Sequence, residues 1–224
     1  MIDELASWSD LAELRQGLYR FFAGALLPPD AERVELLAAA TLTLASSELD
    51  QFAFAPAWRA AADVFCFPPP LEDLDAGYAA LFVSESGSGT CPPLESYYGA
   101  APGRAPLVDG ELRREYAQLG LGVRPDLTVP SDHVSVQLEV MSSLCHGEAH
   151  AWIDGLDRDA IVALRKQWRF LDRHLARWVP VWAEHVERAT SGGPWRAIVE
   201  ATRVYVQHDV DLVTLLTRSR LARA

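Results

Sequence analysis

Four side chains of the kinds that bind metals or act as nucleophiles lie close together in the sequence: Cys145, His146, Glu148 and His150. His146 and His150 are four residues apart and would share a helix face, as some metal ligands do. The order is not that of the His-Glu-x-x-His zinc signature, and Gly147 weakens a helix between the histidines. A metal- or cysteine-dependent enzyme is therefore one hypothesis, but the spacing gives it little support.

A second group of polar residues follows Pro130, where a helix is expected to begin. Ser131 is the expected N-cap, and the helix dipole favours Asp132 in the first turn. The same dipole disfavours a protonated histidine, so we expect His133 to be neutral near pH 7. The pair could be structural or part of a binding surface. We expect Asp132 and His133 to serve partner binding more than stability.

Residues 84–106 interrupt the helical pattern with the sequence SESGSGTCPPLESYYGAAPGRAP. Its four glycines and four prolines exclude a regular element. Loops of this length inside a compact domain are usually functional or disordered. This loop also carries Leu94, Tyr97 and Tyr98, which favour order. We expect its tyrosines and prolines to order it and the loop to form one wall of a binding site.

Helical periodicity dominates the rest of the chain, with no convincing strand pair and no internal repeat. The predicted helices run from Ser9 or Asp10 to Pro28-Pro29, from Asp30 through Leu44, from Pro56 to about Phe67, from Leu71 to Phe82, from near Asp109 to Gly120, from after Pro130 through Cys145, from Ile161 to Trp182, and from Trp195 to Leu216. These elements predict an all-α fold, a single-domain bundle of about eight to ten helices over residues 1–224.

The pattern from Ile161 to Trp182 is the longest of these. Pro180 is expected to kink or end that helix, because proline lacks the N–H that an interior turn needs. Trp168, Trp178 and Trp182 fall on its apolar stripe. We therefore attribute these tryptophans to core packing and not to a ligand site.

The composition is that of a globular protein in a reducing compartment. Half of the residues are hydrophobic and 23% are charged. The three cysteines, Cys66, Cys91 and Cys145, form no Cys-x-x-Cys pair, which disfavours a disulfide framework. The first ten residues contain no basic side chain, so they are not a signal peptide. No apolar run approaches the roughly 18 residues of a membrane span. We therefore expect a cytoplasmic protein without membrane insertion.

The negative charge is confined to one part of the chain. The net charge is −11, and residues 1–100 hold 15 acidic and 4 basic side chains, whereas residues 101–224 hold 16 of each. Such a field repels nucleic acid and anionic lipid and favours a cationic partner. Solubility alone is the simpler explanation of the charge. We expect no nucleic-acid partner.

Three segments in a fixed order carry a family resemblance. They are Tyr78-x-x-Leu81-Phe82 with Cys91-Pro92-Pro93-Leu94-Glu95-Ser96-x-Tyr98, then Pro130-x-Asp132-His133 with Leu138-Glu139-x-Met141-x-x-Leu144, then Phe170-Leu171-x-x-His174-Leu175-x-x-Trp178 with Tyr205 and Asp209. Together they resemble the TorD/DmsD/NarJ family of molybdoenzyme-specific chaperones. The resemblance spans roughly residues 10 to 215, and the ordered combination is more specific than any single motif.

The resemblance implies an all-α chaperone that catalyses no reaction and has no cofactor of its own. Its partner would be the N-terminal leader, often a twin-arginine signal peptide, and the apo form of a molybdopterin-containing oxidoreductase. The chaperone would hold that partner in the cytoplasm until the cofactor is inserted. It could be a monomer or a homodimer. An acidic N-terminal half beside an aromatic-lined loop suits a ligand that is basic and then apolar.

Residues at the motif positions are the expected partner-binding residues under this resemblance. They are Tyr78, Leu81, Phe82, Leu94, Glu95, Ser96, Tyr98, Asp132 and His133. The family pattern often has an aromatic residue before the methionine of the later helix, where this chain has Val140. The subfamily therefore stays open, and the client could instead be a nitrate-reductase-like catalytic subunit without an exported leader.

Overall fold

The computed structural model of the protein describes residues 7–44, 47–83, 90–98, 105–122 and 129–221. Their α-helices are, in chain order, α1 (Trp8–Ala25), α2 (Ala31–Leu44), α3 (Ala55–Cys66), α4 (Leu71–Tyr78), α5 (Glu95–Tyr98), α6 (Ala105–Leu119), α7 (Val134–Ile153), α8 (Asp157–Arg173), α9 (Leu175–Ala189) and α10 (Pro194–Leu221). A 3₁₀-helix, η1 (Ser47–Gln51), precedes α3, and a π-helical turn, η2 (Ala79–Val83), extends α4. The prediction of an all-α fold is confirmed.

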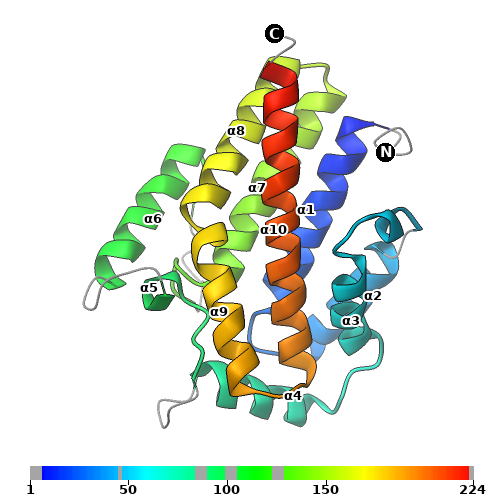
Figure 1. The fold of residues 1–224 in the computed structure, drawn as a ribbon, viewed down its shortest axis with the longest axis vertical. Helices are drawn as coiled ribbons and strands as arrows, with labels where there is room; N and C mark the ends of the chain where they lie inside the picture. Colours follow the sequence, from blue (N-terminus) through cyan, green and yellow to red (C-terminus); the bar gives the residue numbers. More distant parts are fainter. Residues whose placement is uncertain (1–6, 45–46, 84–89, 99–104, 123–128, 222–224) are drawn as a thin grey trace.

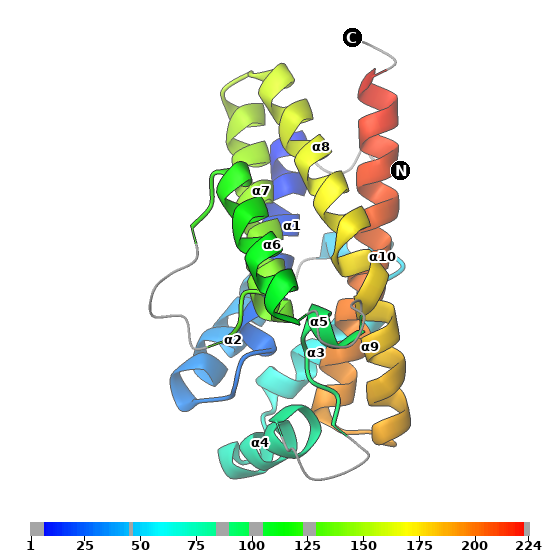
Figure 2. The same ribbon diagram turned by 90° about the vertical axis from the view of Figure 1, so that its left-hand side faces the viewer.

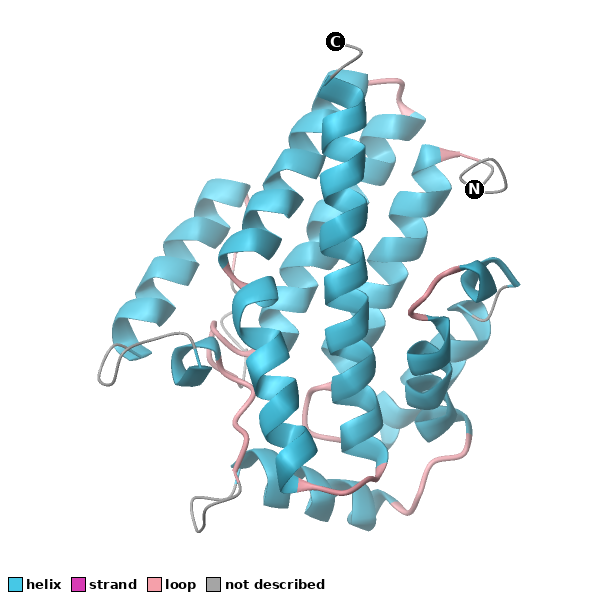
Figure 3. Cartoon of the chain, in the orientation of Figure 1, coloured by secondary structure: helices cyan, strands magenta, loops and turns pink. Residues whose placement is uncertain are grey.

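Helices α1, α7, α8 and α10 run roughly parallel to the long axis of the molecule, and the core extends from between them to α3, α4 and α9 (Figures 1 and 2). Helix α9 lies beside the lower half of α10, and α4 crosses the lower end of the bundle. Helices α2 and α3 pack together on one side, and α6 stands on another. Figure 3 shows helices joined by loops, with no strand arrow in the described parts of the chain.

Aromatic side chains fill the middle of the bundle. Phe21 of α1 meets Trp58 of α3 edge-on, with 4.6 Å between ring centroids. Phe22, its neighbour on α1, contacts Tyr205 of α10 at 5.5 Å. The core residues form one connected cluster, so α1 is covered by other helices on most of its surface. None of the described helices is long and apolar enough to cross a membrane.

The starts of α1 and α6 are among those that differ from their predicted positions. The side chain of Ser7 accepts a hydrogen bond from the backbone N–H of Asp10 at 3.2 Å, so Ser7 is the N-cap of α1 in place of Ser9 or Asp10. Helix α6 begins earlier than expected, at Ala105. The end of α6 is as predicted, because Gly120 follows it with a φ of 85°, a conformation that suits glycine.

The break between α8 and α9 lies at His174 and not at Pro180, which corrects the prediction for this segment. His174 leaves helical geometry, with φ −122° and ψ −95°. Pro180 lies inside α9, near its start. There the proline removes one hydrogen bond, to the carbonyl of Ala176, and the surrounding core compensates for that loss.

The tryptophans of this segment are not all in the core. Trp178 and Trp182 are buried as predicted, at 1% and 0% exposed. Trp168 is 39% exposed, so its assignment to the core was wrong. The break at His174 lets α8 turn its own apolar face, which includes Leu164, toward the core independently of α9.

A buried arginine joins four helices at the centre of the bundle. Arg15 of α1 is 2% exposed, and its Nε and Nη2 donate to the two carboxylate oxygens of Asp209 on α10, at 2.6 and 3.0 Å. Its Nη1 donates to Glu148 on α7 at 2.7 Å. Its Nη2 also donates to Gln167 on α8 at 2.5 Å.

Neighbouring donors complete this polar cluster. The Tyr19 hydroxyl donates to Asp209 at 2.6 Å, and the indole N–H of Trp152 donates to Glu148 at 3.1 Å. The Gln167 amide donates to Glu148 at 2.9 Å. Buried charges are costly unless they are paired and hydrogen-bonded, so the cluster permits one arrangement of the four helices and penalises others.

We predict that Arg15→Met strongly destabilises the protein, because Asp209 and Glu148 would remain buried without a cation. The expected loss is about 3–5 kcal/mol in the free energy of unfolding. Arg20→Met is the matched control, because Arg20 lies on the same helix but is exposed, and a change within about 0.5 kcal/mol is expected. Urea unfolding followed by circular dichroism measures both. Equal midpoints for the two variants would show that the cluster does not stabilise the fold.

Candidate functional site

The described part of the 84–106 loop is held against the start of α7. The N–H of Val134 donates to the carbonyl of Pro93 at 2.9 Å, and the N–H of Glu95 donates to the carbonyl of Asp132 at 3.1 Å. An isolated antiparallel bridge pairs residues 94 and 133 between these bonds. Residues 90–98 are thus ordered on α7, whereas 84–89 and 99–104 lie outside the described residues.

Asp132 and His133 are both buried, with 4% exposed. One carboxylate oxygen of Asp132 accepts from the backbone N–H of Ser96 at 3.1 Å, which fixes the start of α5. Nδ1 of His133 accepts from the backbone N–H of Ser135 at 3.2 Å and caps α7. The two side chains therefore position the loop and the helix.

The capping role of His133 corrects the expectation that Ser131 is the N-cap. Ser131 instead donates from its backbone N–H, at 3.2 Å, and from its hydroxyl to Asp109 of α6. Burial lowers the pKa of His133 from 6.5 to about 4. The ring is therefore neutral near pH 7, in line with the sequence-based expectation, and its unprotonated Nδ1 is available as the cap.

Glu95 is the centre of a second polar cluster. Nδ1 of His174 lies 3.0 Å from each Glu95 oxygen, and its Nε2 lies 3.1 Å from Glu115 of α6. The Gln137 amide donates to Glu95 at 2.5 Å and accepts from the indole of Trp178 at 3.0 Å. Burial alone would lower the pKa of His174, but the two carboxylates outweigh it and raise that pKa. This ion-paired histidine explains the break between α8 and α9.

The other predicted partner-binding residues divide into two groups. Tyr98 stacks on Trp178 with 5.9 Å between centroids and is partly exposed, as are Leu94 and Ser96. Tyr78 and Phe82 are buried and contact each other at 5.1 Å near α4. Leu81 is partly buried beside them. The structure thus brings Leu94, Glu95, Ser96, Tyr98, Asp132 and His133 together. Tyr78, Leu81 and Phe82 form a neighbouring group, joined to the loop where the carbonyl of Leu81 accepts from the backbone N–H of Cys91 at 2.7 Å. Their contact with a partner stays a prediction.

The Cys145–His150 cluster has no shared site. Cys145 is 0% exposed, and burial raises the pKa of its thiol, which disfavours the reactive thiolate. Glu148 is bound within the Arg15 cluster. His146 and His150 are exposed on the other side of α7. No group of three or more metal-ligating side chains converges anywhere in the described residues. These positions argue against the metal or cysteine enzyme.

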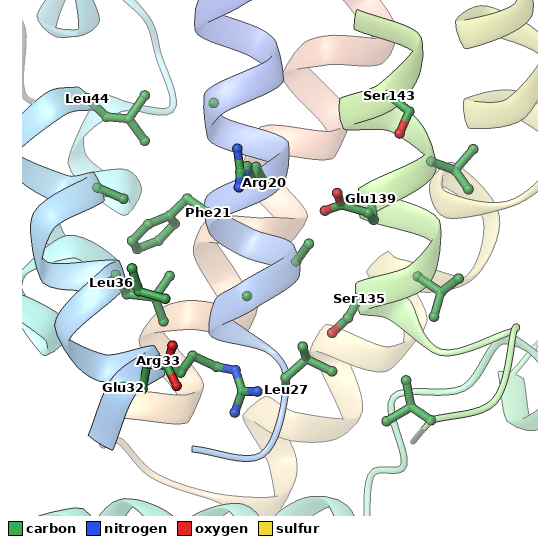
Figure 4. Close-up of a pocket in the computed structure, with 18 of the residues that line it drawn as sticks. Arg20, Phe21, Leu27, Glu32, Arg33, Leu36, Leu44, Ser135, Glu139 and Ser143 are labelled. Carbon is green, nitrogen blue, oxygen red and sulfur yellow. The ribbon is translucent and has the colours of Figure 1, made fainter. Parts of the chain in front are cut away.

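A groove that the sequence did not reveal lies between α2 and α7, with α1 as its floor (Figure 4). Its volume is about 850 Å³. The α2 wall is mainly apolar and includes Leu36, Leu37, Ala40 and Leu44. Leu36 is 63% exposed, an unusual position for a leucine on the wall of a groove. An apolar concave surface of this volume is typical of a ligand site.

The opposite wall, on α7, combines polar side chains with Val136 and Val140. Ser135, Glu139 and Ser143 of α7 line it at four-residue spacing, and Figure 4 shows Ser135 and Glu139 directed from α7 into the groove. On the floor, Arg20 is exposed. Gly17 and Gly24 of α1 let α2 approach closely. A Cβ at Gly17 would lie 2.8 Å from the side chain of Leu44. The groove therefore has one apolar wall and one hydrogen-bonding wall.

Comparisons with known proteins agree with the fold. A family model described as nitrate reductase delta subunit matches residues 48–184. The chlorate reductase assembly chaperone of Ideonella dechloratans is 30% identical over 146 residues, 64% of this chain and 74% of that protein. The selenate reductase assembly chaperone of Thauera selenatis is 32% identical over 150 residues, 66% of this chain and 76% of that protein.

A solved structure resembles this one over most of its length. It is described as a redox enzyme maturation protein from Archaeoglobus fulgidus and superposes with a TM-score of 0.54 at 22% identity, covering 86% of this chain and 93% of that one. At this identity the likeness shows the fold alone. Together, the helical fold and the curated relatives define the class, which is that of assembly chaperones and not of catalysts. Within it, the chain belongs to the nitrate reductase delta subunit family, the TorD- and NarJ-type redox enzyme maturation chaperones.

We predict that Asp132→Ala loosens the loop, because the Ser96 N–H loses its buried acceptor. The expected cost is about 1–3 kcal/mol of unfolding free energy. Limited proteolysis should cut faster within residues 90–98 than in the wild-type protein. Asp109→Ala is a comparison that removes another carboxylate bonded near the start of α7. Unchanged cleavage in Asp132→Ala would contradict the anchoring role.

We predict that His133 makes the protein sensitive to acid. Its folded pKa of about 4 lies below the ordinary 6.5, so the unfolded chain takes up a proton that the folded chain refuses. Stability is then fully present above pH 6.5 and falls as the pH drops toward 4, by roughly 3 kcal/mol. His133→Asn keeps a capping side chain without a titrating ring. Its unfolding free energy should therefore fall less over this range.

His174 is the internal control for that experiment because its shift has the opposite sign. Its pKa is raised, so its contribution is complete below pH 6.5 and is lost as the pH rises through the folded pKa. His174→Gln should lose this alkaline decline and keep the acid decline. Parallel acid profiles for His133→Asn and wild type would rule out His133 as the acid-sensitive group.

Proposed function

We propose that this protein is a cytoplasmic chaperone that binds the N-terminal leader of a molybdopterin-containing oxidoreductase. The client would be the apo form of the enzyme, and its leader a twin-arginine signal peptide. Binding would hold the client until its cofactor is inserted and before export. The proposal rests on the family and on the reductases that the relatives' names give as their clients.

The groove between α1, α2 and α7 is the observation that carries this proposal. A leader that is apolar after its basic start can form an amphipathic helix, and such helices bind by laying their apolar face in a groove. The α2 wall offers side chains for that face, with Leu36 exposed in the unliganded protein. Covering this leucine with a ligand removes apolar surface from water, which favours association.

Charge supports the same ligand. The excess of acidic side chains lies in residues 1–100, which include α1 and α2 of the groove. Glu32 and Glu139 are exposed along its two walls. Arg33 is paired with Asp30 at 2.6 Å, so it adds little free positive charge. The lining of the groove itself is only slightly negative, because the exposed Arg20 also lies on it. The affinity of a basic leader should weaken with salt.

A leader-less client is the second candidate. The matching family model is described as nitrate reductase delta subunit, and a nitrate-reductase-like catalytic subunit without an exported leader is the corresponding client. The same groove would take an N-terminal segment of similar amphipathic character. Peptides from both kinds of client distinguish the two candidates, because a basic start would matter only for the leader.

The predicted partner-binding residues would contribute to client binding in two ways. Leu81, Leu94, Glu95, Ser96 and Tyr98 are partly exposed and would contact the client directly. Four buried residues would act through the segments that they position: Tyr78, Phe82, Asp132 and His133. None of the described loop residues lines the groove, so the loop would form a second contact surface and not a wall of this cavity.

We predict that Leu36→Asp weakens binding of the leader, because it places a charge on the apolar wall of the groove. Losing the burial of one leucine corresponds to about 1.5–3 kcal/mol, or roughly ten- to a hundredfold in affinity. Isothermal titration calorimetry measures this with synthetic peptides that reproduce the N-terminal segments of the molybdopterin oxidoreductases encoded in the same genome.

Leu42→Asp is the matched control. Leu42 lies on the same helix and is 75% exposed, but it does not line the groove. Both changes should leave the melting temperature nearly unchanged, since neither leucine is in the core. Equal affinities for the two variants would exclude the groove as the site. No binding of any such peptide to the folded wild-type protein would refute the proposed function.

A further inference from the structure

The polar wall of the groove contains a buried hydroxyl that lacks a hydrogen-bond partner. The side chain of Ser135 is 4% exposed, and its Oγ makes no hydrogen bond to any of the described residues. Such atoms are rare in native proteins, because an unsatisfied buried polar group costs free energy. Ser135 lines the groove, and Figure 4 shows its oxygen on the side of α7 that faces the cavity. The oxygen is shielded from water by its neighbours, so a donor in the groove would reach it after a small shift of this wall and supply the missing partner.

A carboxylate lies one helical turn further along the same wall. Glu139 is exposed, lines the groove and forms no ion pair within the described part of the chain. Residues four apart on a helix are neighbours on its surface, so Glu139 and Ser135 face the same portion of the groove. The exposed cation of the floor, Arg20, is not joined to Glu139 by any ion pair among these residues.

We propose that Glu139 and Ser135 together bind one arginine of the client's N-terminal segment. This inference rests on the proposed function and assigns its specificity. A guanidinium carries five N–H donors in a planar fork, so it can pair with the carboxylate and also donate to the Ser135 hydroxyl. A lysine ammonium matches such a pair of acceptors less well. The ligand helix then lies with its apolar face on α2 and its arginine on α7.

The two walls also differ in how strongly they discriminate between client segments. The α2 wall accepts any apolar side chains of suitable size, so it discriminates weakly between hydrophobic segments. A hydroxyl and a carboxylate that stay unpaired with the wrong ligand penalise segments without an arginine at this position. The polar wall of α7, and not the apolar wall of α2, therefore selects the client.

A double-mutant cycle tests the assignment. The protein variants are Glu139→Gln and Ser135→Ala, and the ligands are the leader peptides with each arginine replaced in turn by glutamine. Glu139→Gln should weaken the unmodified peptide by about ten- to a hundredfold, and Ser135→Ala by about two- to tenfold. For the one peptide that lacks the relevant arginine, Glu139→Gln should have almost no further effect.

Glu35→Gln is the matched control for charge. Glu35 is exposed on α2 and does not line the groove, so its replacement removes one negative charge, as Glu139→Gln does, without touching the site. Equal losses for Glu139→Gln and Glu35→Gln, or a Glu139→Gln loss that is the same for every arginine-substituted peptide, would overturn the arginine assignment while peptide binding itself stands. Failure of every unmodified peptide to bind wild-type protein would overturn the proposed function and this assignment with it.

Discussion

The pairing of Arg15 with two buried carboxylates is the constraint on which the rest of the structure depends. Its guanidinium is bonded to α7, α8 and α10 from a position on α1, with Asp209 taking two of its donors. Moving α1, α7 or α10 by a turn would leave a charge unpaired in the core, where water cannot replace the partner. The floor of the groove, α1, and its polar wall, α7, are therefore fixed relative to each other. Helix α2 contributes no side chain to this cluster. It packs on α1 through apolar side chains, where Gly17 and Gly24 of α1 leave room for its leucines.

The motif residues connect the loop to the groove through the start of α7. His133 caps that helix by accepting from the N–H of Ser135, the residue whose own hydroxyl lines the groove. The carboxylate of Asp132, in the turn before α7, accepts from the backbone N–H of Ser96 and so ties this turn to the loop. The Glu95–His174–Glu115 cluster then fixes this loop on α6 and at the α8–α9 junction. A contact made at the loop could thus reach the polar wall of the groove through one helix turn.

The sequence predicted the helices because apolar spacing and proline are local signals. It missed the short helix α5, because the glycines and prolines of residues 84–106 indicated a stretch without a regular element. It could not place the break at His174, because the two carboxylates that hold this residue lie far away in the sequence. Trp168 was wrongly assigned to the core because the apolar pattern from Ile161 to Trp182 was interpreted as one helix, whereas this segment forms the two helices α8 and α9. The groove was not predictable either, since it exists only where α2 and α7, separated in the sequence by residues 45–133, flank α1.

The central claim is that the client's N-terminal segment lies in the groove between α1, α2 and α7. Methyl-group NMR of isotope-labelled protein, titrated with a leader peptide, tests it most directly. The account predicts that the perturbed signals cluster on Leu36, Leu44 and Val140, which line the groove. Perturbations confined to Leu94 and Val181, on the loop and on α9, would show that the segment binds elsewhere and would contradict the account.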